Sequence, residues 1–205
     1  MATTERGPYA KSAEVRRKIL QACVDAFGDA GFHGASTKDI ARRAGISHTG
    51  LRHHFPTKEH LLIALLELRA ERSSQLLTEL NARTPQTDPL DALRGQLAIL
   101  RENRQSPGMI ELHTVLSGEA TSPDHPAHGY YVKRYQHLRE LYTQAFAALA
   151  ERGGLRAPFP PPQLATMTIS LINGLQLQWL YDRESVDIEG TVRDFLTSVV
   201  PALGR

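Results

Sequence analysis

The feature that most constrains this chain is the spacing of its apolar residues, which recur every three or four positions along almost its whole length. That period places them on one side of an α-helix, whereas a half-buried strand requires strict alternation. No alternating pattern persists beyond a few residues. With 205 residues, the chain can bury a substantial core in one or two domains. The sequence therefore predicts an all-α fold.

Two short helices are predicted near the N-terminus. Ser36 is suited to cap the first of them, and Asp39 follows it at the distance of a capping box. Gly45 is expected to end this helix, and Ser47 can cap the second, which reaches about His54. Two short helices joined by a tight turn that contains glycine form a helix-turn-helix motif.

Longer helices precede and follow this motif. The first is predicted over about residues 12–30, with Gly31 at its C-terminus, and a long helix runs from Lys58 to about residue 82. Stretches rich in Pro and Gly then interrupt the chain at 84–89, 106–108, 121–129 and 153–162. Helical stripes lie at 90–100, 109–116, 138–149, 162–182 and 188–203. The chain is thus predicted to hold three N-terminal helices and a larger helical body.

Charge is distributed unevenly, although the net charge is only +2. Residues 1–58 hold ten Lys and Arg against five Asp and Glu, whereas the remainder holds 14 against 17. A basic N-terminal part favours a polyanionic partner. The single cysteine, the lack of an apolar leader and the lack of a run long enough to cross a bilayer predict a cytoplasmic protein with no membrane segment.

The second helix of the motif, with its cap, reads SHTGLRHHF at 47–55. Leu51 and Phe55 form its apolar side, together with Ile40 and Ile46 from the preceding helix and turn. The opposite side presents His48, Thr49, Arg52 and His53. In a helix-turn-helix this helix enters the DNA major groove, where Arg and Thr can bond base edges. The motif therefore predicts double-stranded DNA as a partner.

Residues 15–66 resemble the DNA-binding domain of the TetR family of transcriptional regulators. The matching residues are Ile19, Phe27, Gly31, Phe32, Ser36, Thr37, Asp39, Ile40, Ala41, Ala44, Gly45, Ile46, Ser47, Leu51, His54, Phe55, Lys58, Glu59, Leu61 and Leu62. The resemblance implies a DNA-binding domain over 12–58, with the motif at about 36–55, and a helical ligand-binding and dimerisation domain over 59–205. It also implies a homodimeric repressor on a palindromic operator, released by a small organic ligand.

The resemblance also assigns DNA contacts. It implies phosphate contacts for Thr37, Arg43, His54 and Lys58, and base contacts for His48, Thr49 and Arg52. The full expected DNA-binding set is Thr37, Arg43, Ser47, His48, Thr49, Gly50, Arg52, His53, His54 and Lys58. The family usually has Thr in place of Gly50 and, in place of Arg52, a Tyr that commonly meets the DNA backbone. Arg52 therefore has two possible roles, as a base contact or as a phosphate contact.

The helical body offers candidate residues for ligand binding and for dimerisation. A largely apolar ligand is expected to contact Met109, His113, Leu116, Tyr142, Phe146, Met167, Asn173, Gln176 and Trp179. The dimer interface is expected to include Leu171, Gly174, Leu175, Phe195, Val199 and Leu203. For each ligand residue the alternative is an ordinary place in the core, and Gly174 could instead accommodate a side chain of its own subunit.

Other functions are less well supported by the sequence. It has no glycine-rich phosphate loop, GxSxG or HExxH, so neither catalytic residues nor a cofactor are expected. Cys23 lies on an apolar stripe and is expected in the core. His113, His125, His128 and His137 could converge with Glu111 or Asp124, but His125 and His128 are expected to be exposed in a Pro-rich loop, so no metal site is predicted. The remaining alternative is a ligand-binding or scaffold protein whose helix-turn-helix has lost its DNA affinity.

Overall fold

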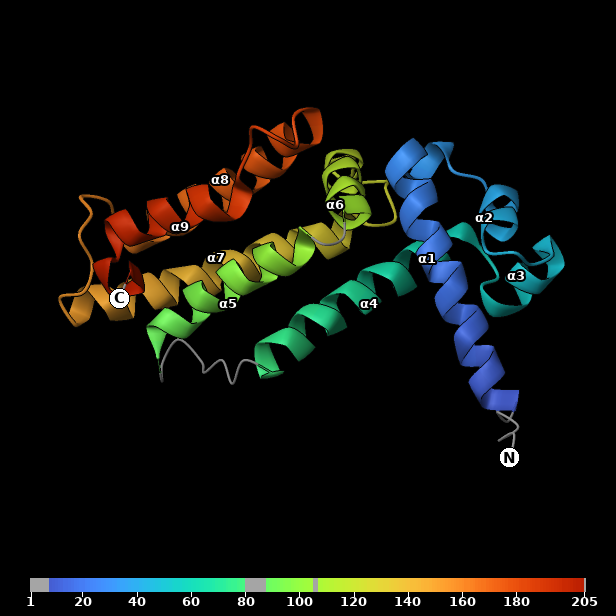
Figure 1. Ribbon diagram of the computed structural model, residues 1–205, viewed down its shortest axis with the longest axis horizontal. Helices are drawn as coiled ribbons and strands as arrows, with labels where there is room; N and C mark the ends of the chain where they lie inside the picture. The colour runs from blue at the N-terminus through green and yellow to red at the C-terminus, as the bar shows by residue number, and fades with distance from the viewer. Residues whose placement is uncertain (1–7, 80–87, 105–106, 205) are drawn as a thin grey trace.

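The computed structural model describes residues 8–79, 88–104 and 107–204, which form an elongated helical molecule (Figure 1). Within these ranges there is no β-strand, which confirms the predicted class. The helices are α1 (Pro8–Gly34), α2 (Thr37–Arg43), α3 (His48–His54), α4 (Lys58–Glu79), α5 (Pro89–Asn103), α6 (Pro107–Glu119), α7 (His128–Glu151), α8 (Pro161–Tyr181) and α9 (Ile188–Val199), followed by a 3-10 turn at Pro201–Gly204. The predicted helix end at 80–82 and the interruptions at 84–87 and 106 lie outside the described residues.

Both short helices begin where the sequence predicts. The Ser36 hydroxyl accepts a hydrogen bond of 3.1 Å from the Asp39 amide, and the Ser47 hydroxyl accepts one of 3.0 Å from the Gly50 amide. Each bond satisfies an amide that has no partner within its own helix. Between the helices, Gly45 has a φ of +70°, which glycine adopts without strain because it lacks a Cβ. The helix-turn-helix spacing is therefore confirmed.

Helix α1 begins earlier than predicted and is broken near its end. It starts at Pro8, because the first turn of a helix tolerates a proline that lacks an amide hydrogen. Gly31 interrupts it with a φ of +68°, and a further helical turn continues to Gly34. The predicted stop at Gly31 is thus a kink rather than the end of the helix.

Figure 1 shows α1, α2 and α3 at one end of the molecule, with α4 running from them along the body. One core joins these four helices to α6 and to the start of α7, and its members include Ile19, Phe27, Leu51, Leu62, Leu112, Leu116 and Tyr131. A second core fills the body between α5, α7, α8 and α9, and includes Leu93, Phe146, Leu164, Val192 and Leu196. The first core therefore packs the N-terminal helices directly against the body.

Two details of these cores follow from elementary chemistry. Cys23 is fully buried in the first core, as predicted, and burial raises the pKa of its thiol to about 12. It therefore stays protonated near neutral pH and is a poor nucleophile. Helix α9 ends at Val199 rather than near residue 203, because Pro201 has no amide hydrogen with which to continue the helix.

No helix in the described ranges is both long and apolar enough to cross a membrane.

The loop before α7 forms the junction between the N-terminal helices and the body. Glu119, at the end of α6, accepts a hydrogen bond of 2.7 Å from the Phe32 amide. His125 is only 4% exposed, so the prediction that it is exposed is wrong, and burial lowers its pKa. The rings of Phe32 and His33 cover it at centroid distances of 5.1 and 5.5 Å. His128 is half-buried at the start of α7, where it bonds the Ala120 carbonyl at 2.8 Å.

Candidate functional site

Helix α3 presents one side to the core and one to solvent. Leu51 and Phe55 are 0% and 2% exposed, and they pack with Ile40 in the first core. Thr49, Arg52 and His53 are exposed on the other side, where the sequence analysis places them. Arg52 forms no hydrogen bond or ion pair with any residue that the structure describes. Its five donor hydrogens are therefore available to a partner outside the protein.

The start of α3 is tied to α2. The Thr37 hydroxyl lies 2.9 Å from Nε2 of His48, so these two expected DNA-binding residues form one polar pair. Gly50 follows the Ser47 cap, and a Cβ at this position would lie 3.1 Å from the Ser47 hydroxyl. A side chain at Gly50 would therefore press on the cap. These contacts fix the orientation of the exposed side of α3.

Arg43 and Lys58, which the sequence analysis expects near phosphates, both make contacts inside the protein. Arg43 donates to Asp29 and to Asp39, each at 2.7 Å. Hydrogen bonds from Arg42 and Arg43 hold the pKa of the Asp39 carboxyl below its usual value. These pairs join the end of α2 to α1 through Asp29.

Lys58 occupies the gap between α4 and the end of α1. Its ammonium donates to the Ala35 carbonyl at 3.0 Å and to the His33 carbonyl at 3.3 Å. It also lies 4.6 Å from the centre of the Phe32 ring. Cations are favoured at helix C-termini, where carbonyls lack partners. Lys58 therefore holds the first turn of α4 against α1, and one of its three donor hydrogens remains available.

The last two histidines of α3 differ in exposure. His53 is exposed and His54 is half-buried, with their ring centroids 5.8 Å apart. Beside them, the guanidinium of Arg16 stacks 4.2 Å from the centre of the Phe55 ring. The sequence analysis did not single out Arg16, although it belongs to a run of three basic residues, Arg16, Arg17 and Lys18. The structure places this cation near the end of α3.

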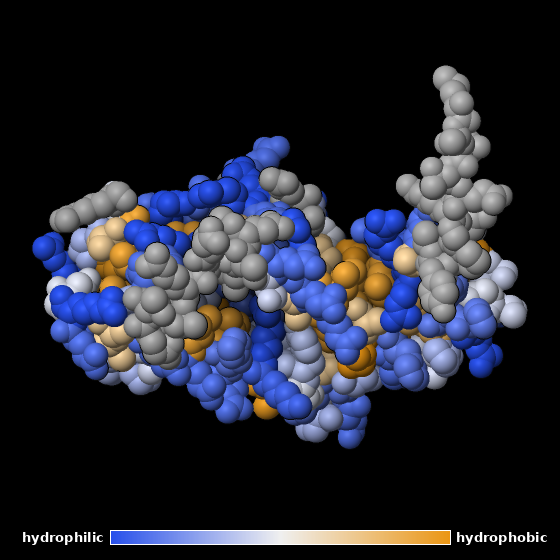
Figure 2. Space-filling view, turned by 90° about the horizontal axis from the view of Figure 1, so that it is seen from below, coloured by the Kyte–Doolittle hydropathy of each residue, from blue (hydrophilic) through white to orange (hydrophobic). Residues whose placement is uncertain are grey.

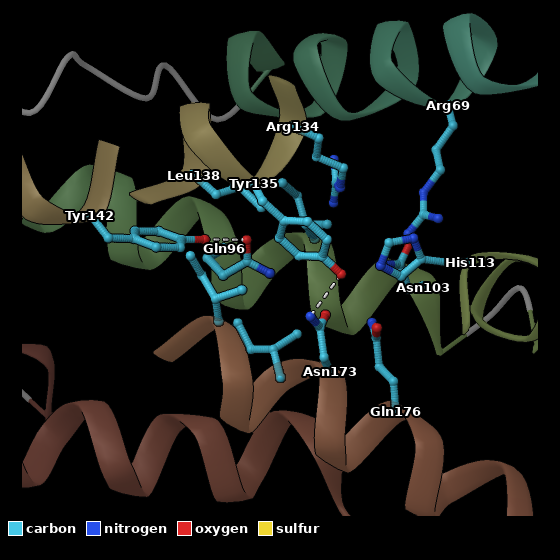
Figure 3. A pocket seen from close by; sticks show the side chains of 13 residues that line it. Arg69, Gln96, Asn103, His113, Arg134, Tyr135, Leu138, Tyr142, Asn173 and Gln176 are labelled. Carbon is cyan, nitrogen blue, oxygen red and sulfur yellow. Dashed lines mark hydrogen bonds between the residues drawn. The ribbon is translucent and has the colours of Figure 1, made fainter. Parts of the chain in front are cut away.

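A pocket of about 30 Å³ lies in the body, between α4, α5, α6, α7 and α8 (Figure 3). Its lining consists of Arg69, Gln96, Ile99, Asn103, His113, Arg134, Tyr135, Leu138, Tyr142, Ile169, Ile172, Asn173 and Gln176. Asn173 donates to the Tyr135 hydroxyl at 3.0 Å, and Tyr142 donates to the Gln96 side chain at 2.5 Å. The pocket is therefore polar and lined by five helices.

The charged groups of this pocket perturb one another. Burial, together with the nearby charge of Arg134, lowers the pKa of Arg69 to about 10. Burial also places the pKa of His113 well below its ordinary value, with additional repulsion from Arg69 and Arg134. His113 is therefore neutral at pH 7, whereas Arg69 remains cationic. Its Nδ1 lies 3.2 Å from the hydroxyl of Tyr131, whose pKa is raised by burial.

The structure brings four of the nine expected ligand residues into this pocket. They are His113, Tyr142, Asn173 and Gln176. Leu116 and Phe146 are fully buried in the cores, and Met167 packs against the second core. Met109 lines a neighbouring groove. Trp179 lines a separate small cavity, and the guanidinium of Arg183 lies 4.9 Å from the centre of its ring.

Arg69 and Arg134 are the charged residues among the nine pocket residues that the sequence analysis missed. Arg69 lies four positions after Leu65, and Arg134 lies three after Tyr131, so each extends a stripe of buried residues. A charged residue that continues an apolar stripe is a signal of a polar interior site. The signal can be found in the sequence only by following each apolar stripe one turn beyond its last apolar residue.

The expected dimer residues lie on α8, on α9 and in the final turn. Leu175 and Val199 are buried in the second core of the same subunit, and Leu171, Phe195 and Leu203 pack partly against it. Gly174 is half-buried, and a Cβ there would meet nothing within 4 Å. Leu177 and Tyr181, further along α8, are 47% and 87% exposed. These two apolar residues were not predicted as surface residues.

Among the described residues, no three His, Cys, Asp or Glu side chains are grouped as metal ligands.

Two family models match the chain. Residues 19–65 match the model described as bacterial regulatory proteins of the tetR family. Residues 125–201 match the model described as the C-terminal part of a BetI-type transcriptional repressor.

Individual proteins agree with these models. The HTH-type transcriptional regulator RutR of Escherichia coli K12 is 45% identical over 64 residues, which cover 31% of this chain and only 30% of RutR. A TetR-family regulator from Agrobacterium tumefaciens has a similar fold, with a TM-score of 0.75 at 19% identity over 92% of this chain and 99% of that one. A transcriptional regulator from Saccharomonospora viridis, solved with choline, has a TM-score of 0.70 at 21% identity over 92% and 98%.

These proteins are transcriptional regulators rather than enzymes, and both ends of the chain match models of the same kind. The chain belongs to the TetR family of transcriptional regulators.

Proposed function

We propose that this protein is a cytoplasmic repressor that binds a palindromic DNA operator as a homodimer and leaves it when a small organic ligand binds. Residues 12–58 would bind DNA, and residues 59–205 would bind the ligand and the second subunit. The exposed side of α3 supports the first part, because Thr49, Arg52 and His53 lie together on a helix whose other side is anchored in the core. Such a helix can insert rigidly into a major groove.

The observation that carries the proposal is the course of α4. Its first residue, Lys58, is bonded to the carbonyls of His33 and Ala35 beside the helix-turn-helix. Three turns later the same helix carries Arg69 into the pocket. A ligand that displaces Arg69 therefore acts on the element that positions the DNA-binding helices. A coupling of about 1–3 kcal/mol would change operator affinity by roughly five- to 150-fold.

Dimerisation is supported by the outer side of α8. Gly174, Leu177 and Tyr181 recur at spacings of three and four, and they expose a small residue beside two large apolar ones. Such a surface suits close packing against a second copy of the same helix. A two-fold axis through α8 would match the symmetry of a palindromic operator.

Ligand binding is supported by the pocket and by the relative from Saccharomonospora viridis, which was solved in complex with choline. That relative shares the fold with this chain, so a ligand site in the helical body is compatible with the architecture. The pocket of this chain has its own lining, however. Its two arginines would repel a cation such as choline.

The direct test is a gel-shift titration of the full chain with the DNA that flanks its own coding sequence. We expect a discrete complex that excess random DNA does not compete away. The variant with both Thr49→Ala and Arg52→Ala should lose this complex and retain its helical content. Variants at Lys38, an exposed residue of α2 outside the expected set, serve as the control. If transcription from the same DNA rises rather than falls on binding, the protein is an activator.

The alternative is a ligand-binding or scaffold protein without DNA affinity. It predicts that specific and random DNA bind equally weakly, and that the double variant changes neither affinity. The exposed Arg52, which has no partner among the described residues, favours the repressor.

A further inference from the structure

Among the described residues that line the pocket in the body there are two arginines and no carboxylate. Arg69 enters it from α4 and Arg134 from α7, with His113 beside Arg69 (Figure 3). The remaining polar lining residues, all of them neutral, are Gln96, Asn103, Tyr135, Tyr142, Asn173 and Gln176. A guanidinium buried without a counter-ion is costly, and two close together also repel each other. No described lining residue therefore balances the positive charge of the two arginines.

The hydrogen bonding of these arginines is incomplete as well. Nε of Arg134 is shielded from solvent and has no hydrogen-bond partner. Arg69 makes no hydrogen bond or ion pair within the described part of the chain. By contrast, Arg72, on the same helix α4, pairs with the carboxylate of Glu102 at 2.6 Å. A buried polar group without a partner calls for an ion or ligand that supplies one.

A groove of about 190 Å³ adjoins the pocket, and its lining includes the charged residues Arg17, Arg69, Arg72 and Glu102 and the polar residues Gln21, Ser73 and Asn103. Arg69 and Asn103 line both hollows, so they stand at the boundary between them. The apolar lining of the groove consists of Leu20, Val24, Leu65, Leu68 and Met109. Figure 2 shows apolar side chains gathered where the N-terminal helices meet the body. The pocket of about 30 Å³ has room for little more than a water molecule or a small charged group, whereas the groove, at about 190 Å³, has the volume for a short apolar chain.

We propose that the ligand is an amphipathic organic acid, with its carboxylate between Arg69 and Arg134 and its apolar tail in the groove. The guanidinium fork matches a carboxylate in geometry, and the two charges favour an anion over a neutral or cationic group. Tyr135, Asn173 and Gln176 offer additional hydrogen bonds to the carboxylate. Only the naming of this acid as the effector rests on the proposed function, since the binding site is argued from its own charges.

Calorimetric titration of the full chain tests this site, with octanoate as the probe. Octanamide is its neutral counterpart, tetramethylammonium supplies a cation, and inorganic phosphate supplies an oxyanion without a tail, all at equal ionic strength. We expect octanoate to bind, and each of the other three to bind at least about tenfold more weakly, because they lack the charge or the tail.

Variants locate the site. Arg69→Met and Arg134→Met should each weaken octanoate binding by about 10- to 100-fold, which is the loss of a charge-assisted hydrogen bond. Methionine replaces a buried cation by an apolar chain, a change that is often neutral or stabilising, so both variants should fold. Arg139→Met removes an exposed arginine of the same helix α7 and should leave the affinity unchanged. The thermal midpoint of each variant, measured without ligand, verifies folding.

Three outcomes would overturn the proposal. They are no binding of octanoate, equal binding of octanoate and octanamide, and an unchanged octanoate affinity in both Met variants. If inorganic phosphate binds as tightly as octanoate, the apolar tail contributes nothing to binding, and the amphipathic part of the proposal is overturned. Operator binding, measured on the same samples, separates this site from the proposed function. If octanoate binds without releasing DNA, the acid site stands but the acid is not the effector. If only neutral compounds release DNA, ligand-controlled release stands but the acid is not the ligand that causes it.

Discussion

Basic residues that look alike in the sequence differ in what they contact. Arg43 and Lys58 hold α1, α2 and α4 together, whereas Arg52 is exposed and forms no hydrogen bond or ion pair with a described residue. Arg69 is half-buried, makes no hydrogen bond or ion pair with a described residue, and has a lowered pKa. A residue's role in this protein therefore follows from its contacts, and substitutions at these positions should separate DNA binding from stability.

Arg52 and Lys58 provide the first comparison. Arg52→Ala should leave the free energy of unfolding unchanged and weaken operator binding by roughly 1–3 kcal/mol if Arg52 contacts a base. Lys58→Ala should lower the free energy of unfolding by about 1–2 kcal/mol, because two hydrogen bonds to carbonyls and a ring contact are lost. Urea unfolding and fluorescence anisotropy at several salt concentrations measure both effects. If Arg52→Ala weakens operator and random DNA equally, Arg52 contacts a phosphate.

The buried histidine of the pocket makes stability depend on pH. The pKa of His113 in the folded protein lies well below its ordinary value of 6.5, so the unfolded chain takes up the proton first as pH falls. The free energy of unfolding should therefore decrease below about pH 6.5, by up to roughly 1.4 kcal/mol per pH unit from this residue. His125, whose pKa is also lowered, acts in the same direction.

Urea unfolding between pH 7 and pH 5 measures this slope. His113→Gln should flatten it, while the same change at the exposed His137 should leave it unaltered. A slope identical in His113→Gln and in the unaltered protein would show that His113 is accessible to protons in the folded state.

At the scale of single elements, the starts of α2 and α3 are set locally and were predictable, whereas the predicted ends of α1 and α9 were wrong. Ser36 and Ser47 cap α2 and α3 through amides three residues away, so no distant part of the chain is needed to recognise them. The burial of His125 depends on Phe32 and His33, which lie more than 90 residues away in sequence, and was predicted wrongly.

Only four of the thirteen residues that line the pocket were expected from the sequence, for a similar reason. His113, Asn173 and Gln176 are polar residues on apolar helices, which the sequence reveals, but their convergence with Arg69 requires α4, α6 and α8 to meet around one pocket. Helical periodicity gives each helix a buried side without saying which helix faces it.

Substitution of Gly31, at the kink in α1, should lower the free energy of unfolding strongly. Gly31 has a φ of +68°, and a Cβ at this position would overlap the Glu119 carboxylate that bonds the Phe32 amide. Gly31→Ala should therefore lower the free energy of unfolding by about 1–3 kcal/mol, through backbone strain and loss of that bond. Thermal or urea unfolding tests it. Gly129→Ala, in the first turn of α7 with nothing within 4 Å of the added Cβ, is the control and should be neutral or slightly stabilising.

At the scale of the whole molecule, two cores hold the helices together, and one helix connects the DNA-binding motif to the pocket. The first core fixes the N-terminal helices to α6 and α7, and the second holds α5, α7, α8 and α9 together. Helix α4 spans the distance between the motif and the pocket (Figure 1). Leu177 and Tyr181 are exposed on the outer side of α8 beside Gly174, and we propose that a second subunit packs there.

Dimerisation can be tested at Gly174. Gly174→Arg places a long charged side chain on the outer side of α8, so we expect a monomer in sedimentation velocity and a loss of cooperative operator binding. Gly118→Arg adds the same side chain at an exposed position of α6 and should remain dimeric. An unchanged dimer mass for Gly174→Arg would place the interface elsewhere.

Sequence-specific recognition of DNA by a symmetric dimer is the central claim, and selection of bound fragments from randomised double-stranded DNA tests it for any operator sequence. The purified full chain should enrich one motif with two inverted half-sites, and the enrichment should disappear for the variant with both Thr49→Ala and Arg52→Ala. Enrichment of no motif, or of the same sequences by that double variant, would contradict the claim that the exposed side of α3 reads DNA.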